Sequence, residues 1–406
     1  MDSLLGTAAR ALAVGDPLGA LKCVALRSDP PALALRGIAL AQLGQYAVAR
    51  RLLQRAQRGF GKGEVVAKAR CLTAEAEIAL LTHDLREFQK PLERASRELE
   101  ARGDVANALF ARLLVIRGLL AVGKVGAAAQ GLAKLSLSGV PARLCAVAEL
   151  LRADVAVLEL RSRDAAEAVE SAARAAENAG IPPLRSEVER ARTELHAVAA
   201  RLASGDAETP LRLAEVEELL RSGAFVIDAC RRSVVVGNAS VSLVTRPVLF
   251  ALALALGAAA PMDATRNALI ASAFGASRPN DSHRARLRVE IGRLRRALAS
   301  VAELRATPNG FALIPRRAAR VVRLLPPSES ETSSLSALLA GGEAWSSSAL
   351  AAALGKSQRS VQRALLELEA AGRVRALGRG RSRRWLAPES TGITTAMLLV
   401  ARGALG

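Results

Sequence analysis

The stretch His283-Arg-Ala-Arg-Leu-Arg-Val-Glu-Ile-Gly-Arg-Leu-Arg-Arg-Ala-Leu298 carries the strongest fold signal in this chain. Its aliphatic residues recur at the spacing of one side of a helix: Leu287, Ile291, Leu294 and Leu298. The opposite side is mostly arginine. An aliphatic back and an arginine front fit a major groove, where guanidinium groups bind guanine edges or phosphates. The candidate DNA contacts of this stretch are Arg284, Arg286, Arg288, Arg293 and Arg296. An ordinary helix with a solvated basic face has the same pattern.

The residues before this helix predict strands and two further helices. Residues 225–243 are rich in β-branched side chains around a Gly-Asn turn, which is typical of short antiparallel strands. A helix is expected next, with Thr245 as its N-cap and Pro247 in its first turn. A shorter helix is expected over residues 264–274.

This order of segments resembles the effector domain of the OmpR/PhoB response regulators over about residues 223 to 315. The likeness rests on Val244-Thr-Arg-Pro-Val-Leu-Phe-Ala-Leu252, Met262-Asp-Ala-Thr-Arg-Asn-Ala-Leu-Ile-Ala-Ser-Ala-Phe-Gly275, Val289-Glu-Ile-Gly-Arg-Leu-Arg-Arg-Ala-Leu298 and Leu304-Arg-Ala-Thr-Pro-Asn-Gly-Phe-Ala-Leu313. The resemblance implies strands, three helices and a β-hairpin wing. Residues 283–298 would be the recognition helix, residues 307–311 the wing tip, and Asn309 a DNA contact.

The chain departs from that family at three positions and in its domain order. Phe274 stands where the family commonly has Trp, Glu290 where it often has His, and Gly292 where Arg is frequent. These changes bear on the base contacts and not on the fold. No receiver domain with a phospho-accepting aspartate precedes the segment, so the resemblance does not imply control by phosphorylation.

A second helix-turn-helix pattern follows a polar linker. Ser346 is expected to cap one helix, Gly355 to make a tight turn and Ser357 to cap the next helix, over residues 358–371. Residues 372–386 are expected to form two strands around an arginine-rich tip. The segment resembles, over about residues 333 to 387, the winged helix of MarR- or GntR-type bacterial repressors. Its candidate DNA contacts are Gln358, Arg359, Gln362, Arg363, Arg379, Arg381 and Arg383.

The N-terminal half reads as helical hairpins in series, without a strand pattern up to about residue 205. In the clearest unit, Gly37 lets two helices approach, Gly44 ends the first helix, and Tyr46, Ala49, Leu53 and Ala56 line the second. This order resembles a tetratricopeptide repeat. Related breaks at Gly15-Asp16, His83-Asp84, Gly123-Lys124 and Ser162-Arg163-Asp164 predict about five irregular hairpins. Such arrays bind a partner protein, mediate dimerisation or act as spacers.

The amino-acid composition and the absence of motifs limit which other functions we expect. The net charge of +19 comes mostly from arginine, which suits nucleic-acid binding but also reflects GC-rich codon usage. The four cysteines and three histidines do not have the spacing of metal ligands, so we expect neither a metal ion nor a cofactor. We expect the cysteines to be small residues of the hydrophobic core. We identify no phosphate-binding loop and no nucleophile motif, and we therefore do not expect the protein to be an enzyme. The most apolar stretch, residues 247–260, is too short to span a membrane.

The sequence thus predicts a mainly α protein in four parts. These are a tetratricopeptide-like solenoid over residues 1–205, two α+β winged helix-turn-helix domains over residues 206–325 and 332–390, and a tail over residues 391–406. The expected function is a cytoplasmic, nucleoid-associated transcriptional regulator that binds double-stranded DNA and uses residues 1–205 for a protein partner or self-association. The alternative is a protein-interaction scaffold without sequence-specific DNA binding.

Overall fold

The computed structural model of the chain describes residues 3–13, 15–82, 88–205, 207–276, 278–317, 320–327, 335, 338–339, 345–354, 356–370, 374–377 and 383–386. Within these ranges the chain is mainly helical, with strands gathered in sheets, as expected. It divides into two compact units. The first comprises residues up to 159 together with 163–195, and the second comprises residues 160–162 and 196–386.

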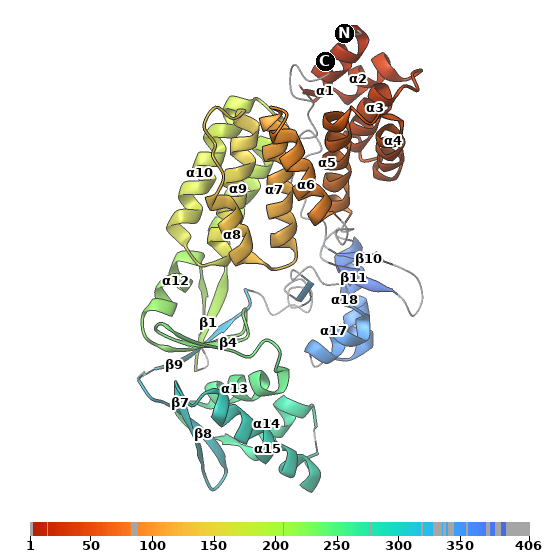
Figure 1. Cartoon of the computed structure of the whole chain (residues 1–406). Helices are drawn as coiled ribbons and strands as arrows, with labels where there is room; N and C mark the ends of the chain where they lie inside the picture. The colour runs from red at the N-terminus through yellow and green to blue at the C-terminus, as the bar shows by residue number, and fades with distance from the viewer. Residues whose placement is uncertain are drawn as a thin grey trace. The chain divides into compact units, whose positions relative to one another are not determined.

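The first unit is built of helices that pack against their neighbours in the chain (Figure 1). They are α1 (Ser3–Ala13), α2 (Pro17–Val24), α3 (Pro30–Gln42), α4 (Tyr46–Gly59), α5 (Val65–Leu81), α6 (Gln89–Glu100), α7 (Val105–Ala121), α8 (Val125–Ala133), α9 (Ala142–Leu158), α10 (Ser162–Ala179) and α11 (Pro182–His196). Their apolar sides meet in one large core of alanine and leucine. Small side chains let helices of this kind pack closely.

The pair α3 and α4 forms as predicted. A Cβ atom at Gly37 would lie 2.9 Å from the Cγ atom of Leu53, so glycine permits this close contact. Gly44 ends the first helix in the left-handed region, with φ of +76°. The break predicted at Ser162 is misplaced, because α10 begins there and the turn precedes it. The break predicted at His83-Asp84 lies outside the described residues.

The second unit contains a six-stranded sheet in the order β2-β1-β9-β3-β4-β5. The strands are β1 (Ala200–Ser204), β2 (Ala207–Leu211), β3 (Phe225–Asp228), β4 (Ser233–Val236), β5 (Ala239–Ser242) and β9 (Val321–Leu325), and α12 (Leu213–Arg221) follows β2. The expectation of no strand before residue 205 was wrong for β1. The reason is that β1 pairs with β9, about 120 residues later, and this long-range contact leaves little trace in the local sequence.

Helices pack on both faces of this sheet, α12 on one and α13 (Pro247–Ala259) on the other. Phe225 and Ile227 of β3 pack into the cluster formed with α13, whereas Val226 points to the opposite face, as period-two alternation requires. A Cβ atom at Gly257 would lie 2.2 Å from Ile227, so α13 approaches the sheet closely. The predicted N-cap of α13 is off by one residue, because Arg246 and not Thr245 occupies that position.

The remaining elements of this part lie against α13. They are β6 (Ala264–Thr265), α14 (Arg266–Phe274), α15 (Asp281–Ala297), β7 (Ala302–Ala306) and β8 (Gly310–Pro315), with the small sheet in the order β6-β8-β7 (Figure 1). The expected helix over residues 264–274 therefore begins two residues later, after a short strand. Thr265 caps it by accepting a hydrogen bond from the backbone N–H of Ala268.

The C-terminal described residues form two helices and a two-stranded sheet. These are α17 (Ser347–Leu354), α18 (Gln358–Ala370), β10 (Arg375–Leu377) and β11 (Arg384–Leu386). Both predicted caps are present, because Ser346 Oγ accepts from the N–H of Ala349 and Ser357 Oγ accepts from that of Ser360. Gly355 and the tail over residues 391–406 lie outside the described residues.

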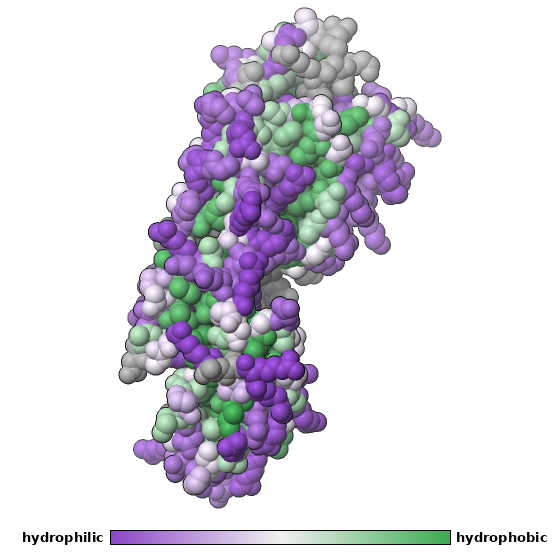
Figure 2. Space-filling view, turned by 90° about the vertical axis from the view of Figure 1, so that its left-hand side faces the viewer, coloured by the Kyte–Doolittle hydropathy of each residue, from purple (hydrophilic) through white to green (hydrophobic). Residues whose placement is uncertain are grey.

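Apolar surface is largely buried or divided. On the face drawn in Figure 2, hydrophilic residues surround separate apolar patches. None of the described helices combines the length and the apolar character that crossing a membrane requires. The expectation that the cysteines are core residues holds for Cys71 but is wrong for Cys230, which is exposed.

Candidate nucleic-acid interface

Helix α15 is held in a defined orientation. Its first turn is fixed by a reciprocal cap, in which Asn280 Oδ1 accepts from the N–H of His283 at 3.0 Å and His283 Nδ1 accepts from the N–H of Asn280 at 3.3 Å. Leu287, Ile291 and Leu294 are at most 1% exposed in the core beneath it. The aliphatic side predicted from the sequence is therefore the buried side, and the opposite side faces solvent.

The predicted arginines are exposed around that side: Arg293 and Arg296 point away from the buried residues, and the others lie toward the flanks of the helix. Arg284, Arg286, Arg288, Arg293 and Arg296 are all exposed. The guanidinium carbon of Arg286 lies 4.4 Å from the centroid of the Phe274 ring, and Phe274 stacks on His283. This cation–π contact restricts the Arg286 side chain without neutralising its charge.

The arginines of α15 differ in how far their charges are compensated. Arg293 pairs with Glu290 at 2.9 Å, and Arg284 pairs with Asp281 at 3.3 Å. Arg288 and Arg296 have no carboxylate partner among the described residues. Arg295, by contrast, donates to the carbonyl oxygen of Leu304 from both Nε and Nη2, so it binds helix to strand.

The turn between β7 and β8 is anchored to the start of α14. Arg266 donates to the carbonyl oxygens of Pro308 at 2.6 Å and Thr307 at 3.1 Å, and its backbone N–H donates to the carbonyl of Asn309. Its guanidinium also lies over the ring of Phe311. The Asn309 side chain, a predicted DNA contact, is exposed at this anchored turn.

Sequence reasoning missed this anchor, whereas Gly310 lies in the wing tip predicted over residues 307–311. A Cβ atom at Gly310 would lie 1.8 Å from the carbonyl oxygen of Ala264, so only glycine fits where β8 meets β6. Asp263 accepts a hydrogen bond from the Thr307 hydroxyl. No local signal identifies Arg266, because its acceptors lie about 42 residues further along the chain.

Helix α18 presents a polar face in the same way. Val361, Leu365 and Leu368 are buried. The predicted contacts on the outer side, namely Gln358, Arg359, Gln362 and Arg363, are exposed. A groove of about 530 Å³ adjoins this face and is lined by Ser346, Ser347, Ser348, Gln358, Gln362, Leu366, Arg383 and Trp385.

Only one of the three predicted wing arginines belongs to the described residues. The guanidinium of Arg383 lies 4.3 Å from the Trp385 ring centroid and pairs with Glu369 at 2.9 Å. Trp385 in turn donates from Nε1 to the Ser347 hydroxyl. Arg383 thus stabilises the fold of its own module, while Arg379 and Arg381 lie outside the described residues.

The arrangement supplies guanidinium and amide donors on two rigid helices. Groups of three or more histidine, cysteine or acidic side chains that could hold a metal ion do not occur among the residues that the structure describes. No family model matches the chain, and comparison with curated proteins and with solved structures finds no match.

Proposed function

We propose that this protein is a DNA-binding transcriptional regulator in which α15 is a recognition helix. The observation that carries the proposal is the separation of residue types on α15, with leucine and isoleucine buried and five arginines exposed. An α-helix fits the major groove of B-DNA, and arginine is the commonest side chain that reads guanine there. The anchored β7–β8 turn would act as the wing.

The second module extends the proposed binding surface. Helices α17 and α18 follow each other as in a helix-turn-helix, and β10 and β11 would form its wing. Glutamine suits adenine edges and arginine suits guanine edges, and both types are exposed on α18. The helical hairpins of the first unit, which we interpret as tetratricopeptide-like, would bind a protein partner or a second copy of the chain.

Selection of duplex sequences by the purified full-length chain tests this proposal. We expect an enriched motif, because base-edge contacts discriminate each position by about 1–3 kcal/mol. We also expect affinity for the selected site to fall steeply with salt, by about 0.9 in the double-logarithmic slope for each phosphate neutralised. Recovery of random sequences alone would contradict the proposal.

A protein-binding use of the C-terminal module is the second candidate function. Leu366 is 53% exposed and lines the groove beside Trp385, so the outer side of α18 is not wholly polar. A partner helix or strand could cover these apolar atoms. If no motif is enriched while Leu366→Ser abolishes binding of a stoichiometric protein partner, the scaffold function replaces the DNA-binding one.

A further inference from the structure

A cluster of charged side chains lies inside the first unit, on four helices that are not consecutive in the chain. Glu77 is on α5, Arg117 on α7 and Asp154 on α9, and α11 contributes three more residues. We call this set the inner carboxylate cluster; its members are Glu77, Arg117, Asp154, Glu187, Arg190 and Glu194. It takes no part in the proposed DNA interface.

The deepest member of the cluster has no partner. Glu77 is 1% exposed, and neither of its carboxylate oxygens has a hydrogen-bond partner among the described residues. Oε2 of Glu187 is also buried without a partner. Buried carboxylates are normally paired, because an unsatisfied polar group away from water costs about 1–3 kcal/mol or more. These atoms are therefore available to an additional hydrogen-bond donor.

The arginines of the cluster do not satisfy this demand. The nearest guanidinium nitrogen of Arg117 lies 3.6 Å from Glu187 Oε1, and that of Arg190 lies 3.9 Å from the same atom. Neither contact involves Glu77 or Oε2 of Glu187, which remain without a hydrogen-bond partner among the described residues. The cluster contains four carboxyl groups and two guanidinium groups, so two negative charges remain when all are ionised.

The cluster extends from solvent into the interior. Asp154 and Glu194 are exposed, the Arg117 and Glu187 side chains are 16% and 10% exposed, and Glu77 is enclosed. A small solute can therefore meet the outer carboxylates first. Local opening of the helices is required before it reaches Glu77, and native proteins open locally at less cost in free energy than global unfolding.

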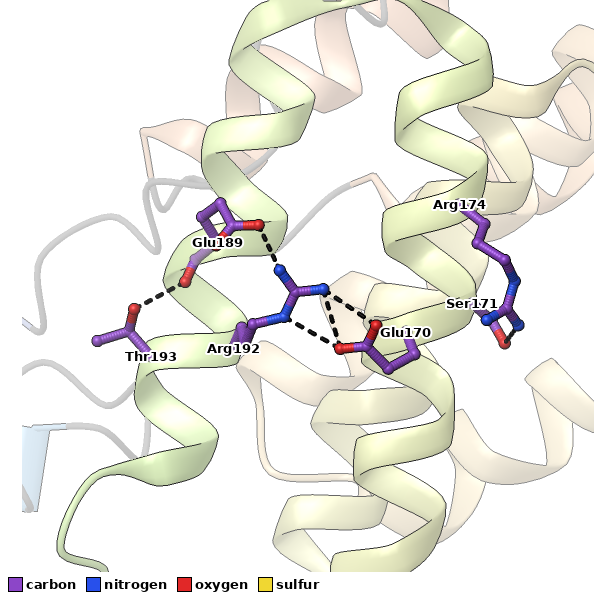
Figure 3. A network of polar contacts seen from close by, with 6 residues as sticks. All are labelled: Glu170, Ser171, Arg174, Glu189, Arg192 and Thr193. Carbon is purple, nitrogen blue, oxygen red and sulfur yellow. Dashed lines mark hydrogen bonds and ion pairs between the residues drawn. The ribbon is translucent and has the colours of Figure 1, made fainter.

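Other carboxylates of the same unit are satisfied. In the exposed contacts between α10 and α11, Arg192 pairs with both Glu170 and Glu189, at 2.9 and 2.6 Å (Figure 3). Each carboxylate drawn there accepts from a guanidinium group. Among the described residues, the buried carboxylate oxygens without a hydrogen-bond partner belong to the inner carboxylate cluster.

We propose that the inner carboxylate cluster binds a small aliphatic diamine or polyamine, whose ammonium groups donate hydrogen bonds to Glu77 and Glu187. Two ammonium groups match the two surplus negative charges. An ammonium offers three donors on a slender stem and can share carboxylates with Arg117, whereas a bare metal ion needs a closer group of ligands than this cluster provides. The regulator would thereby respond to an organic cation, an input independent of the DNA interface.

Proton release accompanies this binding. Burial raises the pKa of Glu187 to about 7 and that of Glu77 well above its ordinary value, with nearby carboxylates acting in the same direction. An ammonium ion stabilises the ionised form of both groups and so displaces their protons. The faces that meet these groups also carry Arg117, Arg190 and Asp154.

Titration calorimetry of the full-length chain with putrescine tests the proposal. We expect saturable one-site binding at pH 8, release of protons detected as a dependence of the heat on the buffer, and an affinity about tenfold lower at pH 6. Butane-1,4-diol, a neutral molecule of the same length, should not bind. Magnesium chloride should not compete at equal concentration.

Matched variants locate the site. Glu77→Gln and Glu187→Gln each keep the side-chain shape but remove a charge, and each should weaken putrescine binding at least about tenfold, the effect of losing one charge-assisted hydrogen bond. Glu170→Gln, which removes an exposed and paired carboxylate, should bind like wild type. Because Glu77→Gln could perturb folding, Glu187→Gln serves as the second variant. Absence of binding at pH 8, or equal binding by wild type and Glu187→Gln, overturns the proposal.

Discussion

Helices α15 and α11 use the same side chain for different purposes. Helix α15 carries six arginines and two acidic residues, whereas α11 carries three of each. On α11 the arginines are paired, with Arg192 bound to Glu170 and Glu189, and Arg185 bound to Glu177 (Figure 3). On α15, Arg288 and Arg296 have no acidic partner among the described residues.

The difference shows that α15 carries more positive charge than nearby carboxylates neutralise, whereas α11 does not. Exposed ion pairs contribute little to stability, so α11 gains mainly local order from its arginines. On α15 most of the charge is left uncompensated on a rigid surface, and such a surface attracts polyanions. Arginine content alone therefore does not mark a binding helix; the excess over neighbouring carboxylates does.

We expect the largest effect on DNA affinity when arginines of α15 are removed. Replacing Arg286 and Arg293 by alanine should weaken binding to a selected DNA site by about 1–3 kcal/mol for each lost base contact. The matched double variant Arg163→Ala/Arg185→Ala removes the same charge from the first unit and should bind DNA like wild type. Electrophoretic mobility shifts measure both. Equal losses in the two variants would mean that only net charge matters.

The next effect concerns the inner carboxylate cluster of the first unit, in which carboxyl groups outnumber guanidinium groups. Burial raises the pKa of Glu187 from 4.5 to about 7, so the folded state holds a proton that the unfolded state releases. The contribution of Glu187 to stability should therefore be most favourable below about pH 4.5 and fall as pH rises to about 7, by up to about 3 kcal/mol. Glu187→Gln should flatten this dependence, leaving the part due to Glu77.

Denaturant unfolding at pH 5 and at pH 8 measures the difference. Glu170→Gln is the matched control, because its carboxylate is exposed and paired with Arg192. It should retain the pH dependence of the wild type. A variant Glu187→Gln that loses stability at pH 8 relative to wild type would show that the ionised carboxylate is stabilising, contrary to its burial.

A smaller effect, on the stability of the second unit, tests how far the N-terminal cap fixes α15. Asn280→Ala removes the acceptor for the N–H of His283 and should destabilise the second unit by about 1 kcal/mol. Ser282→Ala, in the same first turn and exposed, is the control and should change little. Thermal unfolding followed by circular dichroism gives both values. Identical melting curves for the two variants would show that the cap contributes nothing.

The smallest effect is expected on α11. Arg192→Ala breaks two exposed ion pairs and should reduce stability by less than about 1 kcal/mol, with no change in DNA affinity. Chemical denaturation and mobility shifts are sufficient to measure this. A marked loss of DNA binding in this variant would remove the distinction between arginines of the fold and arginines of the interface.

Local patterns in the sequence predicted much of the helical structure and the candidate faces. The buried side of α15 and the caps at Ser346 and Ser357 follow from spacing within one or two turns. Such features depend on neighbours three or four residues apart, which the sequence displays directly. The interpretation of the faces as DNA-binding remains a prediction.

Contacts between distant residues could not be predicted in this way. The pairing of β1 with β9, the anchoring of the turn by Arg266, and the use of Arg383 within its own module join residues that no local period relates. Every residue type has a backbone carbonyl that accepts hydrogen bonds between strands, and every type except proline has an N–H that donates, so these bonds leave almost no signature in side-chain identity.

What the sequence alone determined is which surfaces are aliphatic and which are basic, because periodicity encodes the two sides of a helix. The tertiary structure sets which charged side chains are paired within the fold and which face solvent. Whether Arg295 faces a carbonyl, or Glu77 a solvent-free interior, depends on elements brought together across the chain, and burial changes the energy of a charge far more than its neighbours in sequence do.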